Sequence, residues 1–142
     1  YFQKMTGIDC KPISVELTYG LERICMFVQS KKDVFEIDWN NDGVKYRDVY
    51  LQSEKEFSAY NFDHANTDSL LKNFEIAESE CKSLLEKKLS LPAYDQCLKA
   101  SHIFNLLDSR GVISVAERTG FINRIRDLAK GSGSAWLENQ KE

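Results

Sequence analysis

The sequence lacks several features that would place it in a special class. Its 142 residues contain no apolar run of about 18 residues, which is the length that a membrane-spanning helix needs. The first residues have neither the basic start nor the apolar stretch of a signal peptide. The net charge of −3 provides no overall positive field toward RNA or an anionic membrane. We therefore expect a globular protein without a membrane role, in which any nucleic-acid contact depends on a local patch or on a partner chain.

Common catalytic and metal-binding motifs are also missing. The sequence contains no GxxxxGK[ST], GxGxxG or GxSxG motif. His64 and His102 are isolated from other metal ligands, and we expect His102 to be a structural residue on the core side of a helix. Residues 38–43 resemble the opening of an EF-hand loop, but Val49 stands where a glutamate should bind calcium. We predict no metal site.

The four cysteines form no CxxC pair. Three of them, Cys25, Cys81 and Cys97, fall within helical apolar patterns, whereas Cys10 does not. We expect reduced thiols packed in a core, which is typical of cytoplasmic proteins.

The first part of the chain predicts strands. Residues 12–18 alternate between apolar and polar side chains, as expected for a half-buried strand that starts near Pro12. Residues 1–6 are a candidate partner strand, with a turn at residues 7–9. Because one or two strands do not make a stable sheet, we expect this part to belong to a larger sheet. The chain starts inside a predicted strand without an initiator methionine, and we therefore expect a fragment of a longer protein.

The remainder of the chain predicts helices. The first covers residues 20–29, an irregular segment occupies 30–45, and a short helix is expected at 50–57. Three longer helices follow: one at 67–88, a second opening with Pro92, and a third opening with the capping box Ser114 to Glu117. Residues 131–133, Gly-Ser-Gly, are expected to loosen or break the third helix.

Each long helix carries an apolar stripe that we expect to form the core. The stripes consist of Leu70, Leu71, Phe74, Ala77, Cys81, Leu84 and Leu85; of Tyr94, Cys97, Leu98, Ser101, Phe104 and Leu107; and of Phe121, Ile122, Ile125, Leu128 and Ala129. The sequence therefore predicts an α+β fold that is predominantly α, with a short antiparallel strand pair followed by a helical bundle.

A candidate site lies where the first predicted strand meets the first helix. Gly20 at this corner lets the backbone come close to a ligand, and Arg23 follows in the first helical turn. The planar guanidinium of an arginine can stack on adenine or hold phosphate oxygens. Glu16 and Thr18 would point the same way from a strand, about 7 Å apart, and a carboxylate beside a hydroxyl suits a small ammonium group.

These residues also have ordinary interpretations. An arginine near a helix start is usually solvated or paired with a carboxylate, and Glu22 in a first turn commonly favours the helix dipole. Glu16 and Thr18 can equally be the wet face of an edge strand. The basic side chains of the C-terminal region likewise fit either a solvated surface with ion pairs or a contact with RNA or an acidic partner. These are Arg110, Arg118, Arg124, Arg126 and Lys130.

A resemblance to a known family changes this balance. The stretch from Glu16 to Arg23, ELTYGLER, followed by an apolar helix, resembles motif 3 of class II aminoacyl-tRNA synthetases. Further stretches resemble the α subunit of the bacterial two-subunit glycyl-tRNA synthetase over nearly the whole chain. They are Tyr1-Phe-Gln3, Gly7-Ile-Asp-Cys-Lys-Pro12, Tyr60-Asn-Phe62, Leu91-Pro-Ala-Tyr94, Phe104-Asn-Leu-Leu-Asp108 and Ile113-Ser-Val-Ala-Glu-Arg118.

The resemblance implies roles for particular residues. Arg23 matches the motif 3 arginine that covers adenine and reaches the γ-phosphate of a bent ATP. Glu22 matches an acid that supports this arginine, and Gly20 belongs to the same ATP-binding motif. Glu16 and Thr18 match residues that bind the ammonium group of glycine. Gln3 is expected to border the amino-acid pocket.

The resemblance also implies a reaction and partners. The α subunit activates glycine with ATP and Mg²⁺ to glycyl-adenylate, and the glycyl group then moves to tRNA-Gly. The partners are a β subunit and a second α subunit in a heterotetramer. Residues 1–63 are expected to be the C-terminal part of the catalytic domain, and 64–142 a helical domain. The family's motifs 1 and 2 have no match here, so we expect no activity from these residues alone.

An alternative function is a helical interaction module. In that case residues 64–142 serve mainly to dock the β subunit. Protection of Arg23 by ATP would support the ligase, whereas capture of the β subunit by residues 64–142 would support the module.

Overall fold

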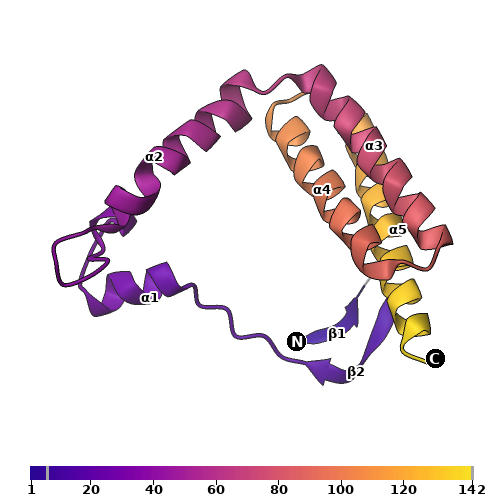
Figure 1. Cartoon of the computed structure of the whole chain (residues 1–142), viewed down its shortest axis with the longest axis horizontal. Helices are drawn as coiled ribbons and strands as arrows, with labels where there is room; N and C mark the ends of the chain where they lie inside the picture. Colours follow the sequence, from indigo (N-terminus) through magenta and orange to yellow (C-terminus); the bar gives the residue numbers. More distant parts are fainter. Residues whose placement is uncertain (6, 142) are drawn as a thin grey trace. The chain divides into compact units, whose positions relative to one another are not determined.

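The computed structural model describes residues 1–5 and 7–141 and shows an α+β fold that is mostly helical (Figure 1). The chain divides into two compact units. One consists of Tyr1–Ser14 together with Ala65–Glu142, and the other of Val15–His64. No helix in the described residues combines the length and the apolar character that crossing a membrane requires.

A short hairpin opens the first unit. Strands β1 (Phe2–Met5) and β2 (Ile8–Ser14) pair antiparallel, with Met5 opposite Ile8 and Phe2 opposite Ser14. Gly7 has a φ of 86°, a left-handed conformation that glycine adopts without steric cost. The turn predicted at residues 7–9 is confirmed only at Gly7, because Ile8 and Asp9 already belong to β2. The predicted partner strand at residues 1–6 is confirmed over Phe2–Met5, and residue 6 lies outside the described residues.

The predicted strand at residues 12–18 is wrong in its bounds. β2 starts at Ile8, so Pro12 lies inside the strand, and residues 15–20 form no regular element. The reason is the lack of a partner, because β1 has four residues and reaches only Ser14. An extended segment without a neighbour has no ladder hydrogen bonds, whatever its alternation of side chains.

Three helices form the core of the first unit: α3 (Thr67–Glu86), α4 (Ser90–Ser109) and α5 (Val115–Asn139). They pack side by side (Figure 1). Asn66 caps α3 by accepting a hydrogen bond from the Ser69 backbone at 2.9 Å. The predicted stripes of α3 and α5 are confirmed, since their members are buried or packed against the core.

The predicted stripe of α4 is partly wrong. Cys97, Phe104 and Leu107 are buried, but Tyr94 and Leu98 are about half exposed. Small residues form the rest of the buried face, namely Ser90, Ala93 and Ala100. They let α4 approach its neighbours closely, and a prediction that weighs large apolar residues most heavily misses such a face.

The predicted core position of His102 is also wrong. It is exposed on α4, whereas its neighbours Phe104 and Leu106 are buried. Because the core face of α4 passes through Ala100, Phe104 and Leu107, the helical rotation turns position 102 away from it.

The long helix α5 begins as predicted. Ser114 Oγ accepts a hydrogen bond from the Glu117 backbone at 3.2 Å, and Glu117 returns one by accepting from the Ser114 backbone at 3.1 Å. The expected break at residues 131–133 is wrong, since α5 continues to Asn139. Gly131 and Ser132 lie where the helix faces the core: Ser132 is buried, and a Cβ at Gly131 would lie 2.8 Å from Leu85 Cδ1. Small side chains are needed here for packing, which outweighs their low helix propensity.

One partly buried ion pair joins α3 to α5. Arg124 Nε donates to both carboxylate oxygens of Glu78 at 3.1 Å, and Lys82 Nζ lies 2.9 Å from Glu78 Oε1. The Arg124 guanidinium also lies 4.6 Å from the ring centroid of Phe74 and 5.0 Å from that of Phe121. Glu78 is therefore held by two cations, and Arg124 by a carboxylate and two aromatic rings.

The second unit holds three helical elements joined by turns. They are α1 (Leu21–Val28), the short η1 (Val34–Glu36) and α2 (Tyr46–Ala59), followed by a π-helical turn, η2 (Tyr60–His64). The helix predicted at 20–29 is confirmed, and the one predicted at 50–57 starts earlier, where Asp48 accepts a hydrogen bond from the Lys45 backbone at 2.7 Å.

The Glu78–Arg124 pair makes stability depend on acid pH. Arg124, and after it Lys82, lowers the pKa of the Glu78 carboxyl to about 2 from 4.5. A lowered folded-state pKa stabilises the fold fully above the unfolded value, and this contribution is lost as the pH falls from about 4.5 toward 2. At roughly 1.4 kcal/mol per pKa unit, we expect Glu78→Gln to lower the free energy of unfolding by about 3 kcal/mol at pH 7 and much less at pH 2.5. Denaturant titration measures this, with exposed Glu80→Gln as the control. An equal loss at both pH values would contradict the prediction.

The glycines of α5 give a second prediction. A Cβ added at Gly120 would have nothing within 4 Å of it. Replacing an exposed helical glycine by alanine gains about 1 kcal/mol, and we expect this gain from Gly120→Ala. Gly131→Ala should gain less, because its Cβ would displace Leu85. Thermal denaturation compares the two variants, and an equal gain at both positions would show that Leu85 does not restrain position 131.

Candidate functional site

The residues that the sequence singled out lie mostly at one corner of the second unit. Residues 15–20 run without regular structure into the start of α1, and Gly20 precedes the helix with φ 75° and ψ 123°. A φ in this range is strained for any residue with a Cβ, so a glycine suits the corner. The Ile24 backbone donates to Gly20 O at 3.2 Å and closes the first turn.

Glu16 and Thr18 lie together on the segment before this corner. Thr18 Oγ1 donates a hydrogen bond directly to Glu16 Oε1. The two side chains therefore lie on the same side, as expected, although the segment that carries them belongs to no strand. Both side chains are exposed, and the carboxylate keeps its other oxygen available for a cationic group.

Glu22 and Arg23 occupy the first turn of α1, and both are exposed. Glu22 Oε1 accepts a hydrogen bond from the Tyr46 hydroxyl at 3.3 Å. Glu22 is thus tied to α2, whereas the guanidinium of Arg23 projects from a turn that faces solvent. An exposed, planar cation at a helix start can meet an aromatic base or a phosphate.

Gln3 does not belong to the same unit. It is exposed in β1 of the hairpin, whereas the other five candidate residues lie in Val15–His64. The structure therefore brings together Glu16 with Thr18, and Glu22 with Tyr46, whereas Gln3 belongs to the other unit.

Sequence reasoning missed the residues that hold α1 in place. The Gln29 side chain accepts from the Asp38 backbone at 2.8 Å and donates to its carbonyl at 3.0 Å. Tyr46 binds Glu22 across 24 positions of sequence. No local pattern reveals such pairs, because the partners are separated by nine positions in one pair and by 24 in the other.

A network of charges surrounds that turn. Asp38 lies 2.8 Å from Lys31 Nζ and 3.6 Å from Lys45 Nζ, and Glu36 binds Lys45 and Arg47. These lysines lower the pKa of the Asp38 carboxyl, with the Lys31 hydrogen bond as the largest cause. The Asp38 carboxylate therefore pairs with two lysines. Asn40 Oδ1 accepts hydrogen bonds from two backbone amides of the turn, at 3.0 and 3.2 Å.

Metal ligation has no support in the described residues. Residues 1–5 and 7–141 contain no group of three His, Cys, Asp or Glu side chains that could hold an ion. Cys81 and Cys97 are buried and free, and burial raises the pKa of both thiols. Thiols in this state are packing residues and poor nucleophiles.

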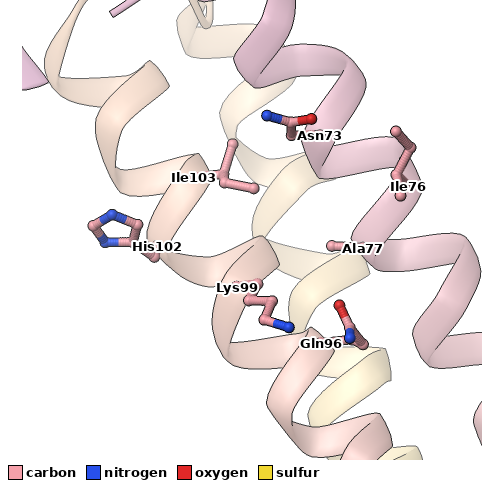
Figure 2. A pocket seen from close by; sticks show the side chains of 7 residues that line it. All are labelled: Asn73, Ile76, Ala77, Gln96, Lys99, His102 and Ile103. Atoms are coloured by element: carbon pink, nitrogen blue, oxygen red, sulfur yellow. The ribbon is translucent and has the colours of Figure 1, made fainter.

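A surface hollow lies between α3 and α4 and is lined by none of the candidate residues. Its lining consists of Asn73, Ile76, Ala77, Gln96, Lys99, His102 and Ile103 (Figure 2). The hollow is open and largely apolar, with few polar groups that converge on one point. It lacks the constellation that a catalytic pocket needs.

Most of the basic side chains of the C-terminal region have partners within the bundle. Arg118 Nε lies 3.1 Å from Asp108 Oδ2, Arg124 binds Glu78, and Arg110 donates to the Ala65 carbonyl at 3.0 Å. Arg118 and Arg124 therefore fit the interpretation as a helical surface with ion pairs, and Arg110 has a backbone partner.

A comparison with known families finds one family that matches the chain. The model of the family described as "Glycyl-tRNA synthetase alpha subunit" matches residues 1–141. The match covers essentially the whole chain, including the segment from Glu16 to Arg23, the helix α1 and the three-helix bundle. This chain therefore belongs to the glycyl-tRNA synthetase α subunit family.

Proposed function

We propose that residues 15–23 form part of the site at which this subunit activates glycine with ATP. The family supports glycine–tRNA ligase function. The observation that carries the more specific proposal is the position of Arg23, exposed in the first turn of α1 directly after the Gly20 corner. There the guanidinium can lie over adenine and donate to the γ-phosphate.

In this proposal, glycine binds at the segment that precedes the corner. The Glu16 carboxylate binds the ammonium group, and Thr18, which donates to Glu16, fixes the direction of that carboxylate. Glycine has no side chain to grip, so larger amino acids are rejected sterically. In this proposal Glu22 supports Arg23, Gly20 allows the backbone to approach the nucleotide, and Gln3 borders the amino-acid pocket.

The chemistry depends on positioning and charge. The glycine carboxylate attacks the α-phosphorus in line with the leaving pyrophosphate, and a cation near the phosphates stabilises the growing negative charge. Mg²⁺ comes with ATP as part of the substrate. Because the described residues form no metal cluster, no residue of this chain is assigned to the ion.

The complete enzyme contains further parts. We propose a heterotetramer of two α and two β subunits that acts on tRNA-Gly in the cytoplasm, which the free thiols Cys81 and Cys97 support. Residues 1–63 belong to the class II catalytic domain and residues 64–142 to a helical domain. The family's motifs 1 and 2 complete the catalytic sheet.

Exposed apolar side chains support this larger assembly. Large apolar residues are exposed throughout the corner: Val15, Leu17, Tyr19, Leu21, Ile24, Phe27 and Val28. Leu17 is 77% exposed and Phe27 is 87% exposed. Large apolar side chains exposed in such number along one segment are normally covered by other protein, and the further strands of the catalytic sheet are the proposed cover.

A specific observation also favours the helical interaction module. Leu91, Tyr94 and Leu98 on α4 are 70%, 47% and 50% exposed. Their spacing of three and four residues places them on one face of the helix. An exposed apolar helix face can bind another protein, and under this second function the protein that it binds is the β subunit. The two functions are compatible in the intact enzyme.

The direct test replaces Arg23 in the intact α/β enzyme. We expect Arg23→Ala to lower ATP–pyrophosphate exchange by about 10²–10³-fold, because a cation that stabilises the transition state is lost. Arg23→Lys should recover only part of this activity, since a lysine keeps the charge without the planar fork. Arg126→Ala, on α5 away from the corner in sequence, is the control and should leave the exchange unchanged. Full exchange activity in Arg23→Ala would overturn the proposal.

A second prediction concerns the 142 residues alone. We expect no ATP–pyrophosphate exchange above background, because no residue of this chain matches the motif 2 arginine that holds the α-phosphate. Circular dichroism of the same sample checks that the helices have formed. Robust exchange by this folded chain would contradict the prediction.

A further inference from the structure

The position of α1 is fixed from outside the helix. None of its eight residues, all of which the structure describes, is buried, and Gly20 provides no side-chain cap. A helix this short is marginal on its own in water. The direction of Arg23 therefore depends on what holds the two ends of α1 within the second unit.

The C-terminal end is held by a two-way amide contact. Gln29 accepts from the Asp38 backbone at 2.8 Å and donates to the Asp38 carbonyl at 3.0 Å. Lys31 adds an ion pair to the Asp38 carboxylate at 2.8 Å. These contacts place the last turn of α1 but leave the first turn, which carries Arg23, to be placed separately.

The N-terminal end is held by Tyr46. Its hydroxyl donates to Glu22 Oε1 at 3.3 Å. The Tyr46 ring is half-buried among aromatic neighbours, with its centroid 4.7 Å from that of Tyr50 and 6.1 Å from that of Trp39. The Tyr46 backbone donates to Ile37 O at 2.8 Å, which fixes the residue from its other side. A rigid phenol thus meets the residue adjacent to Arg23.

We propose that Tyr46 is a positioning residue for ATP, which holds the first turn of α1 through Glu22 and so directs the guanidinium of Arg23. The inference rests on the proposed role of Arg23. Glu22 and Arg23 are consecutive in one helical turn, so fixing the carboxylate restricts the rotation of α1 about its anchor at Gln29. Tyr46 acts through Glu22 and touches no substrate.

The test is Tyr46→Phe in the intact α/β enzyme. This change keeps the ring in its aromatic cluster and removes only the hydroxyl. Loss of one hydrogen bond to a charged group has a modest effect on binding. We therefore expect kcat/KM for ATP to fall about 3–10-fold, mainly because KM rises. The KM for glycine should stay unchanged, because Glu16 and Thr18 precede the corner. General destabilisation would not separate the two substrates in this way.

Two further variants make the test decisive. Tyr50→Phe removes a hydroxyl from the same aromatic cluster and should leave both KM values unchanged. In an Arg23→Ala background, Tyr46→Phe should add no further loss, because its effect passes through Arg23. An unchanged KM for ATP in Tyr46→Phe, or a full additional loss in the double variant, would overturn the role of Tyr46. If Arg23→Ala alone had no effect, the proposed function itself would fail.

Discussion

The orientation of one short helix is the constraint on which the candidate site depends. α1 buries none of its own residues, so it takes its position from polar contacts at both ends: Gln29 with the Asp38 backbone, and Glu22 with the Tyr46 hydroxyl. The partners in both contacts, Asp38 and Tyr46, lie on either side of the turn at residues 40–43. The aromatic cluster around Tyr46 is therefore a scaffold for the corner, although it lies far from the corner in sequence. An exposed cation on such a helix is directed by the contacts of its neighbours more than by its own burial.

The three-helix bundle follows a different principle. Its core is closed by small residues where helices approach closely, as at Ala93, Ala100 and Gly131. The partly buried pair of Glu78 and Arg124 joins α3 to α5 and uses one arginine of the basic C-terminal region for structure. This unit carries its own hydrophobic core, whereas Ile37 is the one buried apolar side chain among the described residues of Val15–His64. The second unit would therefore gain more stability than the bundle if another protein covered its apolar side chains.

The sequence predicted the helices well because their signals are local. The capping box at Ser114 and the stripes of α3 and α5 depend on neighbours within one or two turns. It failed where a distant partner decides the outcome. Residues 15–18 alternate like a strand but have no strand to pair with, Gly131 is tolerated in a helix because Leu85 lies against it, and Tyr46 meets Glu22 only in the folded chain. The corner at Gly20 and Arg23 was found through its motif, whereas the contacts that hold it required the structure.

The most direct measurement of the central claim is a crystal structure of the intact α/β enzyme with a non-hydrolysable analogue of glycyl-adenylate. We expect the Arg23 guanidinium to lie against the adenine ring and the Glu16 carboxylate to contact the glycine ammonium. The hydrogen bond from Tyr46 to Glu22 should be retained in the same structure. Binding of the analogue elsewhere, with Arg23 directed into solvent, would contradict the claim.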